Sequence, residues 1–565
     1  MTTAVTPAGG TAAKEPYRLR WAGLAVLCLS LLIVVMANTS LIVAAPGMLR
    51  DLQLTSADMQ WIIDGYTVPY AALMLLFGVL GDRYGRRSAL LAGLIAFAAG
   101  AVYGSFADSA GDVIVARIVM GVGAAVIMPA TLSLLVAMFP VHERARAIAA
   151  WAATSGLAIA LGPLLAGWLL ESNSWGSTFL INVPIAALAA IAALILVPAS
   201  KADDLTRTDW VGGALSVAAL GGIVYTIIEG FHFGWGTGVI ATSIGSVVAA
   251  VVRLEIIVSP FTKINRVKSP VFYSVVAAVL FVGWELRHPR PLLDVRRVAD
   301  RTVGGACMSV LLLFLVAFGA IYFVAQQFQF VLGYGPLETG LRLLPLAATV
   351  SLGAALSGRL APRLGARILV GAGMIAAAAG ILTLTVTDGA SGFTPFLISL
   401  LLLGLGIGLA TPPSTDLIMG GFPDSDLGAA GGLNDTAVEF GGSLGIAVLG
   451  SILATTYHRE ISGFLDGLPL ANLPGPMADQ AAMAIEAAGD SVGGAAIVAE
   501  ELAANPFAAS YAQPLLDASS AAFAQAISSA SLVAGIVLLV GAAAVTALLP
   551  RGLHTRARSE AQIGS

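Results

Sequence analysis

Long apolar runs, separated by short polar segments, follow one another along almost the whole chain. A membrane-spanning helix needs about 20 mostly apolar residues. Runs of about that length predict fourteen spans, at roughly 21–45, 58–80, 88–107, 112–137, 146–170, 178–198, 210–229, 237–258, 302–326, 337–358, 366–387, 393–413, 429–456 and 527–550. The first run exceeds the roughly 7–15 apolar residues of a cleavable signal peptide, so we expect it to remain as a span.

The composition excludes several classes of protein. Of the 565 residues, 58% are hydrophobic and 11% are charged, against roughly a quarter charged in soluble domains. A soluble enzyme is therefore excluded, and the net charge of −4 argues against nucleic-acid binding. The two cysteines, Cys28 and Cys307, lie in apolar runs and predict no disulfide framework. None of the lysines follows a glycine-rich phosphate loop, so we expect no ATP site. We also expect no cofactor, no metal and no catalytic residue.

The basic residues predict the orientation in the membrane. Among the 29 Lys and Arg residues, only Arg50 and Arg459 fall in expected outer loops, while Arg117 and Arg342 lie in or beside spans. All others lie on the side of the two termini. Because basic loops stay inside, we expect both termini to be cytoplasmic.

One stretch does not fit this scheme. Ser-Val-Val-Ala-Ala-Val occurs at 246–251 and again at 274–279, with a basic segment between the copies. If both copies crossed the membrane, every later basic loop would change sides. We therefore expect one copy to span, and the other to lie at the inner surface as an amphipathic piece. The span at 237–258 contains the first copy, whereas the apolar piece 271–284, with the second copy, is short for a span. Whether the repeat is a natural or an engineered duplication stays an open question.

A loop motif occurs twice and divides the chain into halves. Gly78-Val-Leu-Gly-Asp-Arg-Tyr-Gly-Arg-Arg87 is followed 280 residues later by Gly358-Arg-Leu-Ala-Pro-Arg-Leu-Gly-Ala-Arg367. Eight spans separate the copies, so the halves are parallel repeats, as in many secondary transporters. The predicted division is a tail 1–20, a six-helix bundle 21–198, two extra spans with a basic linker 199–301, a second bundle 302–550 with an outer loop 457–522, and a tail 551–565.

The motif at 78–87 matches the G-x-L-x-D-R-x-G-R-R signature of the major facilitator superfamily. The chain resembles its fourteen-helix drug–proton antiporter branch, a branch of multidrug efflux proteins, over about 20–456 and the last span. The resemblance implies an all-α membrane fold with two parallel six-helix bundles and two extra central helices. In this motif we expect Asp82 to pair with arginines or cap the next helix. These contacts would form a cytoplasmic charge latch that holds the two halves in one state and opens and closes as a gate during alternating access. Its candidate residues are Gly78, Asp82, Arg83, Gly85, Arg86 and Arg87. Pro362 replaces the aspartate in the second copy, where the latch should be weaker.

Two further motifs follow the same family. Arg117 begins a segment resembling the family's helix 4 motif, and an arginine inside the membrane needs a partner. The resemblance links Arg117 to proton coupling, and a structural ion pair is the alternative. A segment resembling the antiporter signature, typical of exporters, contains Gly156, Gly162, Pro163 and Gly167, with Ala166 in place of a glycine.

Carboxylates inside the spans are the main candidates for proton coupling. Asp64 lies about one turn into 58–80, whereas Asp435 and Glu439 are four apart in 429–456 and share a helix face. A carboxylate out of water, especially beside another, is protonated more readily. Such a group can alternate between a proton and a cationic substrate. Structural polar pairing is the alternative, mainly for Asp435.

Position 37 departs from the family pattern. The run Met36-Ala37-Asn38-Thr39 has alanine where the family typically has the aspartate of Asp-x-Thr. Either Asp64 and Glu439 couple without it, or this chain selects and couples differently.

Aromatic side chains are weaker candidates for a cavity wall. Trp61 and Tyr66 flank Asp64, and Phe318 and Tyr322 belong to a stripe of every fourth residue. Aromatic faces attract lipophilic cations. Packing is the more frequent reason for such a stripe.

These features together predict a proton-driven antiporter in a bacterial cytoplasmic membrane, exporting lipophilic, cationic drugs, biocides or dyes by alternating access. The expected partners are protons, the small substrate and membrane lipid, and we expect a monomer. An exporter of a dedicated metabolite or lipid is the alternative. A membrane sensor or scaffold is disfavoured, because it would not need acids inside the spans of both halves.

Overall fold

The protein is almost entirely helical. The computed structural model describes residues 17–200, 209–233, 270–288, 291, 293–389, 391–422, 427–468, 475–505 and 508–550. Within these residues, ten helices are long and apolar enough to cross a membrane. Every span expected from the sequence coincides with a helix, except 237–258, which lies outside the described residues.

The N-terminal half consists of α1 to α7. Its helices are α1 (Arg20–Leu52), α2 (Ser56–Tyr84), α3 (Arg86–Ser105), α4 (Ala110–Met138), α5 (Val141–Leu170), α6 (Ser177–Leu180) and α7 (Asn182–Leu196). A capping box begins α2, where the Thr55 side chain accepts a hydrogen bond from Asp58 N and the Asp58 carboxylate accepts one from Thr55 N. This start fixes the helical phase of the residues that follow, including Asp64.

The C-terminal half consists of α13 to α20. Its elements are α13 (Arg301–Gln326) with the π-helical turn η1 (Gln327–Val331), α14 (Pro336–Leu364), α15 (Ala366–Leu382) with η2 (Thr383–Val386), α16 (Phe393–Gly420), α17 (Leu427–Asp466), α18 (Gly475–Asp490), α19 (Val492–Ala504), η4 (Ala509–Tyr511) and α20 (Ala512–Leu548). Between the halves lie α8 (Trp210–Phe233), α11 (Pro270–Arg287) and the short α12 (Val295–Val298).

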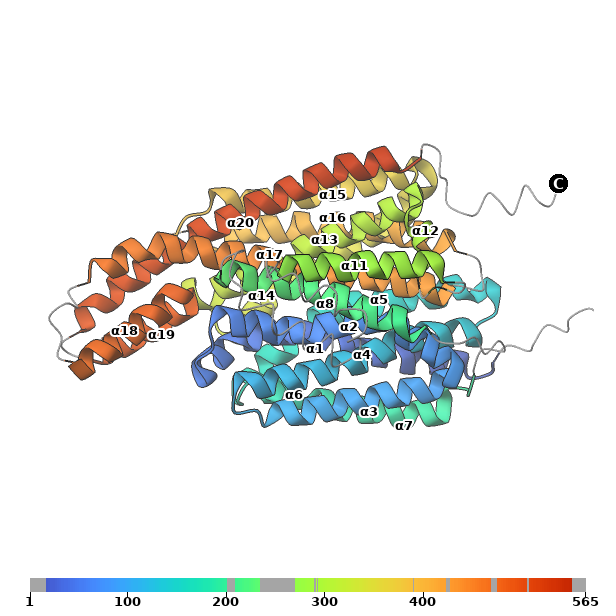
Figure 1. Ribbon diagram of the computed structural model, residues 1–565, viewed down its shortest axis with the longest axis horizontal. Helices are drawn as coiled ribbons and strands as arrows, with labels where there is room; N and C mark the ends of the chain where they lie inside the picture. The colour runs from blue at the N-terminus through green and yellow to red at the C-terminus, as the bar shows by residue number, and fades with distance from the viewer. Residues whose placement is uncertain are drawn as a thin grey trace, which may run out of the picture.

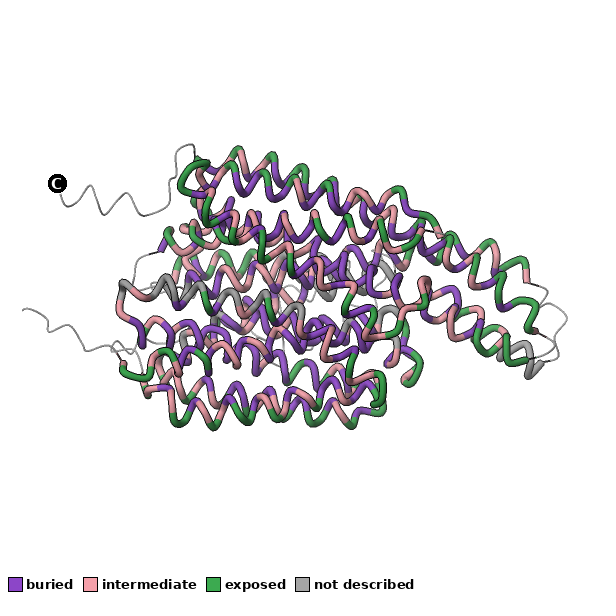
Figure 2. The backbone as a smooth tube through the Cα atoms, turned by 180° about the vertical axis from the view of Figure 1, so that it is seen from behind, coloured by how far each residue is buried: buried purple, intermediate pink, exposed green. Residues whose placement is uncertain are grey.

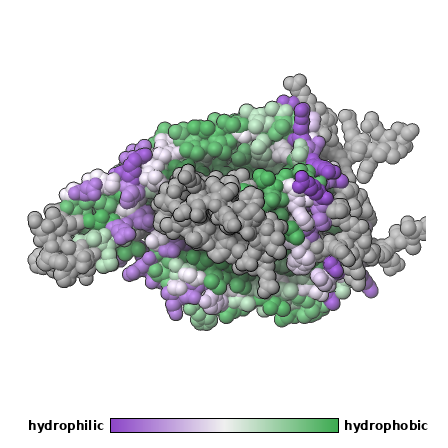
Figure 3. Space-filling model, viewed as in Figure 1, coloured by the Kyte–Doolittle hydropathy of each residue, from purple (hydrophilic) through white to green (hydrophobic). Residues whose placement is uncertain are grey.

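The two halves lie side by side with their long helices roughly parallel to one axis. In Figure 1 the blue to cyan helices form the lower part and the yellow to red helices the upper part, with the green α8 and α11 between them. Buried positions concentrate where the helices face one another (Figure 2). Among the residues that Figure 3 colours, hydrophobic ones gather above and below the centre of the view and hydrophilic ones toward its two ends, as expected for a membrane protein.

The two ends of the bundle differ in charge. The connections α2–α3 and α14–α15 lie at one end and contain Arg86, Arg87, Arg363 and Arg367. We call this the arginine-rich end. The opposite end, from which α18 and α19 project in Figure 1, is the one that the sequence predicts to face outward, and we call it the outer end.

The stretch 271–284 lies in α11, which packs along α8 (Figure 1). Several of its large apolar side chains, such as Val279 and Leu280, are exposed. That only one copy spans stays a prediction. The C-terminal turn of α11 meets the first turn of α8, so the two helices run antiparallel. The second Ser-Val-Val-Ala-Ala-Val copy therefore belongs to a bundle helix, and the first lies outside the described residues.

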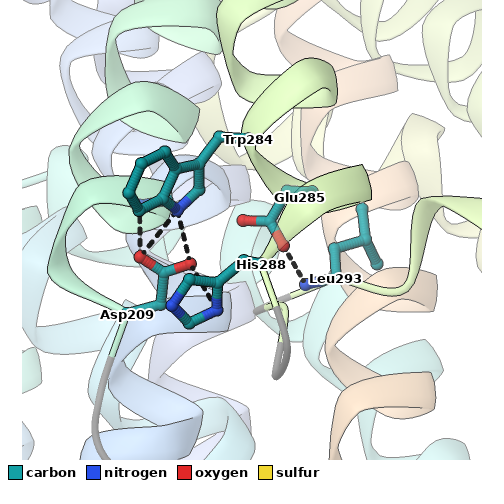
Figure 4. A network of polar contacts seen from close by, with 6 residues as sticks. Asp209, Trp284, Glu285, His288 and Leu293 are labelled. Carbon is teal, nitrogen blue, oxygen red and sulfur yellow. Dashed lines mark hydrogen bonds and ion pairs between the residues drawn. The ribbon is translucent and has the colours of Figure 1, made fainter.

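A polar network joins α8 to α11 at the arginine-rich end (Figure 4). Asp209 is 6% exposed, and its Oδ1 accepts a hydrogen bond from Gly212 N at 2.8 Å. The indole nitrogen of Trp284 donates to Asp209 Oδ2 at 2.8 Å, and His288 Nδ1 lies 3.5 Å from the same oxygen. One carboxylate thus caps α8 and binds α11.

The neighbouring Glu285 connects this hairpin to the linker that follows it. Its Oε2 accepts a hydrogen bond from Leu293 N at 3.1 Å. The Leu293 side chain packs with Leu76 of α2. The linker is therefore held against the N-terminal half before the chain enters the C-terminal half.

The outer segment 457–522 is helical where it is described. The helix α17 continues to Asp466 and α20 begins at Ala512, both beyond the predicted span limits. The hairpin α18–α19 lies between them, as the alanine-rich sequence suggests. Tyr457 OH lies 2.9 Å from both Ala488 O and Ser519 Oγ, which ties the hairpin to α17 and α20.

We expect Asp209→Ala to destabilise the protein, because Gly212 N–H and the Trp284 indole lose a buried, charged acceptor. A hydrogen bond to a charged group contributes about 1.5–3 kcal/mol, which corresponds to a fall in Tm of several degrees. Fluorescence-detected unfolding in detergent measures this. Asp51→Ala, at an exposed aspartate of α1, is the control, and equal Tm values for both variants would contradict the expectation.

Candidate functional site

Asp64 lies at the contact between α2 and α17, where the two halves meet. Its side chain is fully buried, at 0% exposure. Asp64 Oδ1 accepts hydrogen bonds from Ser443 Oγ of α17 at 2.5 Å and from Thr67 Oγ1 of α2 at 2.9 Å. Asp64 Oδ2 is buried and has no hydrogen-bond partner among the described residues. Asp64 therefore has one satisfied oxygen, bound from both halves, and one oxygen able to take a proton.

The carboxylates of α17 continue this polar face toward the arginine-rich end. Asp435, Glu439 and Ser443 are spaced by four residues, so they lie on one side of the helix. Glu439 is 8% exposed, and in the described part of the chain its buried Oε2 has no hydrogen-bond partner. Asp435 Oδ1 accepts from Asn434 Nδ2 at 3.1 Å, and Thr415 Oγ1 of α16 donates to Asn434 Oδ1 at 2.9 Å.

Among the described residues, Arg117 of α4 is the largest fully buried side chain, at 0% exposure. Its guanidinium donates to Ile62 O and Ala37 O, both at 3.1 Å, and to Asn38 Oδ1 at 3.3 Å. These acceptors belong to α2 and α1, so Arg117 joins three helices of the N-terminal half. A small cavity beside it is lined by Ala37. All three acceptors are neutral groups, and Arg117 makes no direct ion pair with a described residue.

The aromatic candidates surround these polar groups but are mostly packed. The Arg117 guanidinium carbon lies 4.2 Å from the centre of the Tyr66 ring, and Tyr66 OH donates to Val34 O at 2.8 Å. Trp61 packs against Ala447 of α17. Phe318 and Tyr322 are buried in α13, which favours the packing explanation of their spacing.

The signature in α5 lies at two close helix contacts. A Cβ atom built on Gly162 would meet Thr39 Oγ1 and the backbone of α1. One built on Gly167 would lie 2.5 Å from Leu337 Cα of α14, in the other half. Pro163 shares this contact, since a Cβ on Gly340 of α14 would lie 2.6 Å from Pro163 O. Gly156 lies in α5 between the signature and the arginine-rich end.

The loop motif 78–87 forms the α2–α3 corner. Gly85 caps α3 and has φ of +119°, a conformation that favours glycine, and Gly365 repeats it with +80°. Arg86 N donates to Ser200 O at 2.9 Å, and Arg87 NH1 to Val197 O at 3.2 Å. The corner is thus tied to the end of the chain segment that follows α7.

The expected role of Asp82 in this motif stays a prediction. The N-cap position of α3 is Gly85. Asp82 lies in the last turn of α2, and its side chain is outside the described set. Gly78 packs near Pro129 of α4, and the Arg83 guanidinium lies 5.4 Å from the Tyr84 ring centre. The latch stays a prediction.

Several contacts between the halves lie toward the outer end. Besides Gly167–Leu337, a Cβ on Gly450 of α17 would lie 3.2 Å from Gln60 Nε2 of α2. Gln329 Nε2 donates to Val43 O of α1 at 3.4 Å. The halves are therefore packed together on the outer side of Asp64.

A sequence model of the Major Facilitator Superfamily matches residues 27–446. The chain belongs to the major facilitator superfamily. It is a membrane transporter of this superfamily and not an enzyme. It is 32% identical to the multidrug efflux pump LfrA of Mycolicibacterium smegmatis over 93% of this chain and 95% of that protein. It is 30% identical to the tetracenomycin C resistance and export protein of Streptomyces glaucescens, over 95% and 92% of the two chains.

Two further comparisons agree with this placement. The methyl viologen resistance protein SmvA of Salmonella typhimurium is 30% identical over 92% of this chain and 96% of that protein. A bacterial homolog of the human lysosomal transporter Spinster, solved in an inward-facing and unoccupied conformation, has a TM-score of 0.60 and 15% identity, covering 96% of this chain and 100% of that one. This likeness supports the superfamily fold alone.

Sequence reasoning about this superfamily member missed the hydroxyl groups that bind Asp64 and the amide that binds Arg117. Thr67 is three residues after Asp64 and Ser443 is four after Glu439, so helical spacing places both beside known candidates. Asn38 adjoins Ala37, the position already singled out. No sequence signal pairs Asp64 with Ser443, because 379 residues separate them.

Two glycines of the α5 signature should respond differently to alanine. Gly162→Ala pushes α5 against α1 inside one half, so we expect a lower Tm of the transporter. Gly167→Ala separates α5 from α14, and we expect more of the outer-open state, because the backbone of Leu337 cannot give way as a flexible side chain can. Thermal unfolding and outer-end spin-label distances measure the two effects. The prediction is wrong if Gly162→Ala opens the outer end and Gly167→Ala only lowers the Tm.

Proposed function

We propose that the protein is a proton-coupled antiporter that exports lipophilic cations by alternating access of its two halves. The observation that supports this most is the polar face between α2 and α17. Asp64 and Glu439 belong to different halves, are buried, and each keeps one oxygen without a partner in the described part of the chain. A carboxylate without full hydrogen bonding in a low-dielectric site binds a proton or a cation well.

The electrostatics of this face favour exchange over simple binding. Arg117 interacts with both Asp64 and Glu439 but is already hydrogen-bonded by α1 and α2. Its charge therefore stabilises the ionised carboxylates without neutralising them by direct contact. Protons arriving from one side can displace a cation bound from the other, which couples their movements in opposite directions.

The names of relatives support a lipophilic cationic substrate. SmvA is named for resistance to methyl viologen and LfrA as a multidrug efflux pump. Tyr66 and Tyr322 lie near the carboxylates, and aromatic faces attract cations. We propose Asp64 and Glu439 as the coupling groups, Asp435 as a secondary acid toward the arginine-rich end, and Arg117 as their electrostatic partner.

The proposed setting is a bacterial cytoplasmic membrane with the arginine-rich end and both termini inside. The arginines at the α2–α3 and α14–α15 connections support this orientation. The proton gradient supplies the free energy, so the cycle needs no cofactor. The 78–87 corner would gate the inner side, and the protein would work as a monomer with protons, substrate and lipid as its partners.

Export of a dedicated metabolite is the second candidate. It is favoured by Ala37, which removes one acid from the region of Arg117. The tetracenomycin C resistance and export protein, named for a single compound, is as similar to this chain as SmvA. A transporter with fewer acidic side chains near its site is less suited to bind dications.

Proton release from proteoliposomes tests the proposal. With an inwardly acidified gradient, ethidium or a quaternary ammonium compound should release protons from the wild-type protein. We expect Glu439→Gln and Asp64→Asn to lower the release to about a tenth or less, since each removes a proton site while keeping the shape. Asp466→Asn, at an exposed aspartate of α17, is the control and should release protons as the wild type does.

The remaining outcomes separate the two candidates. If the folded wild type binds the compound and releases no protons, proton–cation exchange of that compound is refuted. Ala37→Asp then distinguishes the causes: restored release means that the missing acid uncouples this chain, and continued absence means that its substrate is of another class.

A further inference from the structure

We infer that Ser443 is a positioning residue through which the protonation of Asp64 controls closure of the outer end. The inference rests on the proposed proton coupling. It adds the contact through which proton binding changes the position of one half relative to the other. Ser443 belongs to α17 and Asp64 to α2, so their hydrogen bond exists only while the two halves are together at this level.

The local geometry makes this contact unlike the other bonds of Asp64. Asp64 Oδ1 accepts hydrogen bonds from two hydroxyl groups of similar chemistry, from Ser443 Oγ at 2.5 Å and from Thr67 Oγ1 at 2.9 Å. Thr67 is three residues away on the same helix and moves with Asp64. Only the bond from Ser443 is lost when the halves separate. Both hydroxyl groups are buried, so water cannot replace either in the closed state.

The contact lies within a continuous α2–α17 seam. Toward the outer end, Gln60 of α2 meets Gly450 of α17, seven residues beyond Ser443. Gln60 is fully buried, and neither atom of its amide group has a partner among the described residues. Among the described residues, the Gln60 amide therefore adds no hydrogen bond to the seam, whereas Ser443–Asp64 is a hydrogen bond across it.

The strength of this contact depends on charge. A hydroxyl bond to an ionised group contributes more than one to a neutral group. Ser443 therefore favours the closed seam more when Asp64 is ionised than when it is protonated. Among the described groups, Arg117 from α4 and Tyr322 from α13 interact electrostatically with Asp64. Glu439 from α17 and Tyr66 from α2 interact with Arg117 and are linked to Asp64 through it.

Distances between spin labels at the outer end test the inference. The labels are placed by Ser172→Cys and Gly392→Cys, at exposed positions of the two halves, with Cys28 and Cys307 replaced by serine. Ser443→Ala and Thr67→Val each remove one hydroxyl donor to the same oxygen with little change of shape. Each variant is measured in lipid nanodiscs at a pH below and a pH above the range in which buried carboxylates titrate.

We expect Ser443→Ala to lower the ratio of outer-closed to outer-open molecules by about tenfold at the higher pH, which is about 1.4 kcal/mol. At the lower pH the fall should be about threefold or less, as for a neutral hydrogen bond. Thr67→Val should change the ratio by less than about twofold at either pH, because its bond persists in both states. Ser443→Thr should restore the wild-type ratio.

Three results would overturn the inference. They are an equal shift by Ser443→Ala at both pH values, an equal effect of Thr67→Val, and an unchanged ratio in Ser443→Ala. Proton release by the Asp64→Asn variant distinguishes these three results from a failure of the proposed function. If proton release in liposomes requires Asp64 but Ser443→Ala behaves as Thr67→Val, only this inference fails. If proton release does not require Asp64, both fail.

Discussion

The absence of water in the bilayer core governs this structure, because every buried polar group must find its partners within the protein. Arg117 is the clearest case. An arginine in the middle of a span costs several kcal/mol unless it is satisfied. Its three hydrogen bonds to Ile62, Ala37 and Asn38 meet that demand and at the same time fix α4 against α2 and α1. The helix containing Asp64 is thus held rigidly within its own half.

The same rule distinguishes structural carboxylates from those suited to exchange. Asp209 has a backbone amide, an indole and an imidazole around its two oxygens, so nothing is left for a proton or a cation to complete. Asp64 and Glu439 are equally removed from water, yet each has an oxygen that no described group satisfies. In the proposed mechanism, this incomplete bonding at the contact between the halves makes proton occupancy and helix position depend on each other.

Local sequence patterns were enough to predict most of the fold and the elements that contain the site. Apolar runs located the spans because a bilayer imposes their length, and the repeat at 78–87 and 358–367 divided the halves because glycine is needed at Gly85 and Gly365. The segment 271–284 forms α11 beside α8, and the expectation that only one of the two Ser-Val-Val-Ala-Ala-Val copies spans stays a prediction, because the first copy lies outside the described residues. Ser443 was missed because its partner comes from the other half, and helical spacing carries no information across 379 residues.

The alanine at position 37 then has a physical explanation within this arrangement. Arg117 binds the carbonyl of residue 37, which any side chain would provide, and takes its third acceptor from Asn38. The buried guanidinium is satisfied without an acid on α1, so losing that acid leaves no unpaired charge. A carboxylate at position 37 would interact with Arg117 of the same, N-terminal half. Asp64 and Glu439 instead lie on opposite sides of the contact that opens and closes in the proposed cycle, where a proton bound to either would change the attraction between the halves themselves.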